Sequence, residues 1–177
     1  MSERLDSIVL AGGCFWCLDA EYRLVKGVKS VTSGYSGGDL ENPTADQVYE
    51  GNTGHAEAVK VDFDPAVISL ETLLDIFWTM HDPTTLNRQG YDIGTEYRSA
   101  IFYRDDTQKI TAEKSKEAAK KVWGNNIVTE INKLKAFYPA EDYNQNFFEK
   151  HPEKAYCQII INPKLKKLRK KFSELMV

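Results

Sequence analysis

Two cysteines, Cys14 and Cys17, stand three residues apart in the motif GGCFWC, which follows an apolar run. The apolar run predicts a strand, and the helix that we expect over 14–25 begins at the first cysteine. Backbone N–H groups and the helix dipole favour a thiolate there, so we expect a lowered pKa and a reactive thiol. The alternative is a buried cysteine that packs as a small apolar side chain. Gly12 and Gly13 favour the reactive interpretation, because small residues let a ligand approach the backbone closely.

Phe15 and Trp16 separate the two cysteines. Successive side chains on a helix point in different directions, so both rings cannot face the same core. Most such pairs of aromatic residues simply pack in the core. Beside a nucleophilic thiol, however, we expect one of these rings to line a pocket for an apolar substrate group.

Glu57 is the most informative single residue. It lies in HAEAVKVDF (55–63), which we predict to be a strand, and period two places Glu57 on the same face as Val59, Val61 and Phe63. A carboxyl group on an apolar face loses solvation, and its pKa rises. Such a group stays protonated near neutral pH and can act as a general acid. The alternative is an acid at the strand end that points into solvent or pairs with a cation.

Further polar candidates flank a long loop, which we predict over 81–96. Loops of this length inside a domain are usually functional. Tyr97 stands where the loop meets a predicted strand, 97–104, and a phenol there can donate a hydrogen bond to a substrate oxygen. Asp92 and Arg98 are candidates to orient polar groups nearby, or else form a turn and a surface ion pair.

Composition excludes several classes of protein. The chain has 177 residues, 42% hydrophobic and 28% charged, with a net charge of −3, which gives no argument for a nucleic acid or membrane partner. It contains no run long enough to span a membrane and no segment that resembles a signal peptide, so we expect a cytoplasmic protein. Cys157 is the third cysteine, and no histidine stands at finger-like spacing from Cys14 and Cys17, so we expect no metal.

The elements that position these residues alternate between strands and helices. We expect one domain over 1–177, an α/β (α+β) two-layer sandwich in which helices pack on a mixed sheet. The predicted strands are 7–11, 28–36, 55–63, 97–104, 130–137 and 155–161, and the predicted helices are 14–25, 69–80, 105–122 and 162–177.

Several motifs, taken together, resemble a known family, the peptide methionine sulfoxide reductases of type A. They are GGCFWC, GYSGG (34–38), ENPT (41–44), TGHAEAV (53–59), HDPTT (81–85), RQGYDIGTEYRSAIFY (88–103), FYPAEDYNQNFF (137–148) and YCQIIINPKL (156–165). They occur in order over nearly the whole chain. The combination of GCFW, GHAE and GTEYRSAI is specific, whereas a bare CxxC motif would be weak.

The resemblance implies a ferredoxin-like core and the reduction of methionine-(S)-sulfoxide, free or in oxidised proteins. It implies no bound cofactor; thioredoxin, or dithiothreitol in vitro, is the external reductant, and we expect a monomer. Cys14 resembles the nucleophile, which becomes a sulfenic acid, and Glu57 resembles the acid that protonates the sulfoxide oxygen. Phe15 and Trp16 resemble the pocket for the substrate methyl group. The resemblance makes Tyr97 and Asp92 polar helpers and Cys157 a recycling cysteine.

The chain departs from the family pattern at two positions. Ala45 stands where many members have a tyrosine that hydrogen-bonds the substrate oxygen, which leaves that task to Tyr97 and Glu57, with Tyr49 as a further candidate. Cys17 stands where many members have glycine.

The thiol that condenses with the sulfenic acid stays open between two cysteines. Residues three apart on a regular helix hold their β-carbons ~5–6 Å apart, whereas a disulfide needs about 3.8 Å. We therefore favour Cys157 over Cys17.

Two other functions remain as alternatives. One is a thioredoxin-like dithiol oxidoreductase that uses Cys14 and Cys17. The other is a binding module that recognises oxidised methionine without turnover.

Overall fold

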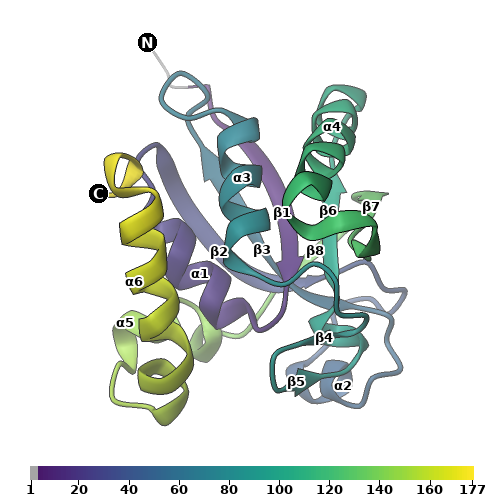
Figure 1. Cartoon of the computed structure of the whole chain (residues 1–177). Helices are drawn as coiled ribbons and strands as arrows, with labels where there is room; N and C mark the ends of the chain where they lie inside the picture. The colour runs from purple at the N-terminus through teal and green to yellow at the C-terminus, as the bar shows by residue number, and fades with distance from the viewer. Residues whose placement is uncertain (1–3) are drawn as a thin grey trace.

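Six strands form one sheet in the order β7-β6-β1-β3-β2-β8 (Figure 1). This computed structural model describes residues 4–177, so the first three residues of the expected 1–177 domain lie outside the described part. Neighbouring strands are antiparallel except β6 and β7, which are parallel. The sheet is therefore mixed, as expected. Its strands are β1 (Asp6–Gly12), β2 (Val28–Ser36), β3 (Ala56–Phe63), β6 (Ser99–Tyr103), β7 (Glu130–Lys133) and β8 (Phe137–Pro139).

The four central strands have the ferredoxin-like arrangement. Along the chain they occur as β1-α1-β2-β3-α3-β6, and in the sheet they lie in the order β6-β1-β3-β2 with every neighbouring pair antiparallel. Two helices cross between strands, α1 (Phe15–Arg23) and α3 (Leu70–Met80). This split β-α-β topology confirms the expected core.

Helices α1, α3 and α6 lie on the same face of the sheet (Figure 1). Alternation along β1 shows the two faces: Ile8 and Leu10 join the large core beneath the helices, whereas Val9 and Ala11 belong to a smaller cluster on the opposite face. The expected two-layer sandwich is confirmed. The remaining helices are α2 (Ala45–Tyr49), α4 (Asp106–Trp123), α5 (Phe147–Lys150) and α6 (Asn162–Lys171).

The predicted strand 155–161 is wrong, because this segment is helical and runs directly into α6. Its β-branched run, QIII, has strand propensity, but the buried residues Cys157, Ile161, Leu165 and Leu168 recur at helical spacing. The helix includes a π-helical segment, Cys157–Ile161. Pro163 lacks an N–H group for the preceding turn, and a π-type bulge is one way for a helix to accommodate that loss.

Smaller differences concern the connections. The predicted loop 81–96 contains a short hairpin, β4 (Arg88–Gln89) and β5 (Asp92–Ile93). Tyr97 ends a 3₁₀ turn, Thr95–Tyr97, and strand β6 begins only at Ser99. Helix α2 follows the turn-rich segment 37–44 and was not predicted.

Phe77 anchors α3 on the sheet. Its ring is fully buried, with its centroid 5.3 Å from that of Trp78 and 4.1 Å from that of His81. We expect Phe77→Ala to lower the free energy of unfolding by about 3–5 kcal/mol, since it removes a ring from a close-packed core. Urea denaturation measures the change. Val122→Ala on the exposed side of α4 is the control and should shift stability by less than about 0.5 kcal/mol. An equal effect of the two substitutions would contradict the packing role.

Candidate active site

Cys14 sits at the junction between β1 and α1. Gly13 has a φ of 99°, a left-handed conformation that suits glycine, and turns the chain sharply between strand and helix. A β-carbon at Gly13 would lie 2.7 Å from Cγ of Gln89, so the β4–β5 hairpin packs directly against this turn. Cys14 is the N-cap of α1, with extended φ and ψ of −62° and 127°. Its side chain is 9% exposed and lies at the wall of a cavity.

Glu57 lies beside Cys14 and points inward, as the alternation predicts. It is 1% exposed, and its carboxyl Oε1 accepts a hydrogen bond of 3.1 Å from the backbone N–H of Phe15. Burial raises the pKa of Glu57 to about 8, and the negative charges of Asp92 and Glu96 act in the same direction. The Phe15 amide and the Cys14 thiol donate toward the carboxyl group and offset part of the rise. Near neutral pH this acid is therefore mostly protonated.

The expected low pKa of Cys14 is wrong. Burial raises the pKa of this thiol well above its ordinary value, and the neighbouring Glu57 and Cys17 raise it further. The backbone amide of Trp16 lowers the pKa, as an amide at a helix start should, but desolvation outweighs it. In the free protein Cys14 is therefore a thiol, and its proton lies close to the Glu57 carboxyl.

Three tyrosines approach Glu57 from different elements. Tyr35 is paired with Glu57 in the β2–β3 register, Tyr49 ends α2, and Tyr97 is half-buried at the end of the 3₁₀ turn before β6. Burial raises the pKa of each phenol, and the charge of Glu57 raises each further. All three therefore remain hydrogen-bond donors at physiological pH. Among them, the sequence singled out Tyr97 and named Tyr49 only as a further candidate.

Asp92 is held by a residue that sequence reasoning missed. The Tyr156 hydroxyl donates a hydrogen bond of 2.9 Å to Oδ2 of Asp92 and lies 3.6 Å from the Cys17 sulfur. Tyr156 thereby links the β4–β5 hairpin to α1. Its position before Cys157 in YCQIII was the only available signal, and the incorrect strand prediction obscured it.

Phe15 and Trp16 have different surroundings. Phe15 is fully buried, and its ring centroid lies 5.7 Å from that of Tyr35. Trp16 is half-buried, and its ring stacks on Phe147 at 3.6 Å with an interplanar angle of 4°. The indole N–H donates a 3.1 Å hydrogen bond to Asn144. The Trp16 ring therefore has a single defined orientation beside Cys14.

The cavity next to Cys14 has a volume of about 620 Å³ and a mostly apolar wall. It is bounded by the β4–β5 hairpin on one side and the start of α6 on the other. Neither Phe15 nor Trp16 contributes to its wall. The lining residues are Cys14, Gln89, Gly90, Tyr91, Asp92, Ala155, Tyr156, Ile159, Ile160, Pro163 and Lys164.

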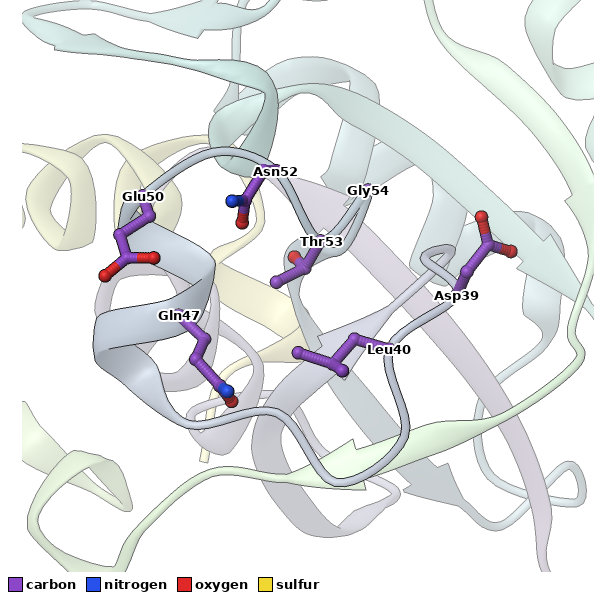
Figure 2. A pocket seen from close by; sticks show the side chains of 7 residues that line it. All are labelled: Asp39, Leu40, Gln47, Glu50, Asn52, Thr53 and Gly54. Carbon is purple, nitrogen blue, oxygen red and sulfur yellow. The ribbon is translucent and has the colours of Figure 1, made fainter.

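A second pocket lies between α2 and the preceding loop (Figure 2). Figure 2 shows Gln47 on α2 and Glu50 directly after the end of that helix. The full lining, which includes part of the loop after α2, is Asp39, Leu40, Gln47, Glu50, Asn52, Thr53 and Gly54. None of these residues carries a thiol or belongs to the group around Cys14. This pocket is therefore separate from the candidate active site.

The other two cysteines are free thiols like Cys14, and both are buried. Cys17 is 2% exposed and one turn along α1, whereas Cys157 is fully buried in the helix before α6.

Within residues 4–177, no three or more His, Cys, Asp or Glu side chains are grouped so that they could hold a metal ion. No helix of the described part is long and apolar enough to cross a membrane.

Comparison with known proteins identifies the family of the chain. The family described as peptide methionine sulfoxide reductase matches residues 6–176. Peptide methionine sulfoxide reductase MsrA of Arthrobacter sp. (strain FB24) is 53% identical over 169 residues, which cover 96% of this chain and 97% of that protein.

Two solved yeast structures have the same fold. Mxr1 from Saccharomyces cerevisiae in reduced form is 38% identical, with a TM-score of 0.83, and the match covers 87% of this chain and 90% of that chain. Mxr1 in complex with Trx2 is 31% identical, with a TM-score of 0.60, over 83% of this chain and 89% of that chain.

The family match and the shared fold define a thiol-dependent oxidoreductase. The chain belongs to the peptide methionine sulfoxide reductase family, and its activity is the thiol-dependent reduction of methionine sulfoxide. The alternative of a thioredoxin-like dithiol oxidoreductase is not favoured, because family and fold both match the reductases. The turnover-free binding module is set aside for the same reason.

Proposed function

We propose that Cys14 is the nucleophile and Glu57 the general acid of this reduction. The observation that carries the proposal is the buried, largely protonated Glu57 carboxyl next to the Cys14 thiol. A sulfoxide oxygen gains negative charge as a nucleophile attacks its sulfur, so a proton donor at this point lowers the barrier.

Cys14 and Glu57 together account for every proton that moves in the reductive step. The Cys14 sulfur attacks the sulfoxide sulfur, and Glu57 gives its proton to the sulfoxide oxygen. Glu57 then accepts the proton of the Cys14 thiol, which lies beside it. The oxygen passes to Cys14, methionine leaves, and Cys14 remains as a sulfenic acid. In this scheme the Cys14 thiol is best protonated before the reaction starts. Its proton then replaces the proton that Glu57 gives to the sulfoxide oxygen.

Tyr97 and Tyr49 provide further donors to the sulfoxide oxygen in this proposal. Both phenols stay protonated, and Glu57 and Cys14 are among the groups that raise the pKa of each. Ala45 and Tyr49 are four residues apart in α2, so their side chains share one face of that helix. Tyr49 thus supplies, from the next turn, the hydroxyl group that is missing at Ala45.

Asp92, Trp16 and Phe15 complete the site. Asp92 accepts the Tyr156 hydrogen bond and adds negative charge that keeps Glu57 protonated. Trp16, whose ring is fixed by Asn144 and Phe147, holds the substrate methyl group, and Phe15 supports it from the core. A sulfoxide sulfur is a chiral centre. If its methyl group is held at one fixed point and its oxygen must face the acid at another, only one of the two epimers fits.

This geometry predicts selectivity for one sulfoxide epimer. With dithiothreitol as reductant, we expect methionine to form from the S epimer of free or N-acetylated methionine sulfoxide. The R epimer should react more slowly by roughly 10²-fold or more, since it would direct its oxygen away from Glu57. Chromatography of methionine after separate incubations measures both rates. Comparable rates for the two epimers would contradict the proposed placement of acid and methyl site.

An external dithiol completes the cycle. The yeast relative Mxr1 has been solved with Trx2 bound, and we propose a thioredoxin as the physiological reductant of this chain as well. The substrates are then oxidised proteins and free methionine sulfoxide, with no bound cofactor. A reducing compartment such as the cytoplasm would supply the reductant and keep all three cysteines reduced between turnovers. We propose that the chain works as a monomeric single domain.

A further inference from the structure

The proposed reductive step leaves a group of buried polar side chains around Cys17 without a role. Cys17 and Glu21 lie four residues apart on one face of α1. Glu21 is 1% exposed, and neither of its carboxyl oxygens has a hydrogen-bond partner. Lys164 reaches this face from α6, and its other side borders the cavity that also contains Cys14. Tyr156, 3.6 Å from the Cys17 sulfur, lines the same cavity.

Lys164 lies close enough to Cys17 and Glu21 for their charges to act on it. Burial lowers the pKa of this ammonium group, but the neighbouring Cys17, Glu21 and Cys14 outweigh burial and leave the pKa above its ordinary value. The same contact acts on the thiol: burial raises the pKa of Cys17 to about 11, and Lys164 is the strongest opposing influence. Lys164 thus stays charged and, together with the Tyr156 hydroxyl, opposes the effect of burial on the pKa of Cys17.

The start of α1 does not have the geometry of a regular helical turn at Cys14. Cys14 is the N-cap and has an extended backbone, and the Cys17 N–H donates a 3.1 Å bond to the Cys14 carbonyl. Cys14 and Cys17 therefore occupy the N-cap and N3 positions, from which, in a capping box, each side chain reaches toward the backbone N–H group of the other residue. The spacing argument against a Cys14–Cys17 disulfide assumed helical geometry at Cys14, and that assumption does not hold.

Cys157 is less well placed. Like Cys17, it is buried in the core and does not line the cavity, but it lies on a separate helical segment and not in the first turn of α1. Its own neighbour is Glu153, whose charge raises the pKa of the Cys157 thiol in addition to the effect of burial.

We propose that Cys17 is the thiol that condenses with the Cys14 sulfenic acid, and that Lys164 is the positioning residue that stabilises the Cys17 thiolate for this step. This inference rests on the proposed role of Cys14. It reverses the preference for Cys157 drawn from sequence.

The condensation balances without another reactant. The Cys17 sulfur forms a bond with the Cys14 sulfur, and the S–O bond of the sulfenic acid breaks. Cys17 is oxidised and the Cys14 sulfur is reduced. The proton that Cys17 gives up ends on the departing oxygen, so that water leaves. The resulting disulfide is the species that the external dithiol reduces.

Disulfide mapping after a single turnover tests the assignment. The reduced protein receives one equivalent of methionine sulfoxide without reductant, is quenched with an alkylating reagent, and is digested for mass spectrometry. We expect a Cys14–Cys17 bond in the wild type and in Cys157→Ser. Cys17→Ser should still release one methionine per chain but retain a sulfenic acid that dimedone traps. A Cys14–Cys157 bond in the wild type, or the loss of disulfide in Cys157→Ser, would overturn the proposal.

The same experiment separates this inference from the proposed function. If methionine is released and the disulfide joins Cys14 to Cys157, only the inference about Cys17 fails. If no methionine is released and no sulfenic acid forms at Cys14, the proposed function fails first.

Substitution of Lys164 tests its positioning role. The charged or titratable groups that face Cys17 are Lys164, Glu21, Tyr156 and Asp92, and Lys164 is the only cation among them. We expect Lys164→Met to slow disulfide formation near pH 7 by roughly three- to tenfold, because loss of the cation reduces the thiolate fraction. The pH profile of disulfide formation should shift to higher pH relative to the profile of the methionine burst measured in the same variant. Lys164→Arg should restore most of the rate. An unshifted profile in Lys164→Met would refute the role.

Discussion

The Cys14→Ser variant is expected to lose methionine sulfoxide reduction by more than roughly 10⁴-fold, the largest effect of any substitution considered for this protein. A serine hydroxyl is far less acidic than a thiol and cannot take the oxygen to form a sulfenic acid. The neighbouring thiol of Cys17 cannot substitute, because the Glu57 carboxyl lies beside Cys14. The burst of methionine after one equivalent of substrate measures the loss.

Two controls make this result interpretable. Far-UV circular dichroism and the melting temperature should match those of the wild type, since serine differs from cysteine by one atom and Cys14 is 9% exposed. Binding of a sulfoxide peptide should persist, because the Trp16 ring and the Tyr97 phenol remain in place. Turnover in Cys14→Ser above roughly 10⁻⁴ of the wild-type rate would contradict the role of Cys14 as nucleophile.

The Glu57→Gln variant is expected to slow the reductive step by about 10²- to 10³-fold. Glutamine keeps a similar shape and a hydrogen-bond donor but cannot give up a proton to the sulfoxide oxygen. The amide oxygen can still accept the Phe15 N–H, so the start of α1 should keep its geometry. Rapid-quench measurement of the methionine burst reports this step without interference from disulfide reduction.

The pH dependence of the burst provides the second readout for Glu57. The pKa of Glu57 lies near 8, so the acid is protonated below that pH and ionises above it. The wild-type burst rate should therefore fall as the pH rises through about 8, whereas the Glu57→Gln rate should be nearly flat over this interval. Glu113→Gln makes the same change at an exposed position on α4 and should leave both rate and profile as in the wild type. A wild-type profile in Glu57→Gln would show that the proton comes from elsewhere.

The local sequence pattern alone was sufficient to predict where two residues of the site, Cys14 and Glu57, lie. The strand-to-helix junction placed Cys14 at a helix start, and the alternation along β3 placed Glu57 on the buried face with Val59 and Val61. Both predictions depend on periods of two and 3.6 residues, which neighbouring residues in the chain define. The split β-α-β order also follows from the alternation of elements and the resemblance to a known family.

The other features of the site and of the fold depend on tertiary contacts. The direction of the Cys14 pKa shift depends on how completely other segments bury the thiol and on Glu57, which is 43 residues away in sequence. The predicted strand 155–161 became a helix because its buried residues contact α1 and the core in a helical register. These effects come from packing between segments distant in sequence.

The surroundings of Cys17 likewise depend partly on the local sequence and partly on the tertiary structure. The sequence identifies a CxxC motif, but it does not indicate that Lys164 and Tyr156 approach this thiol from the other end of the chain. Residue types and local periodicity determined which side chains could perform the chemistry and which way they point along their own elements. Desolvation and the pairing of charges between α1 and α6 arise only when the chain is folded, because both depend on which surfaces exclude water together.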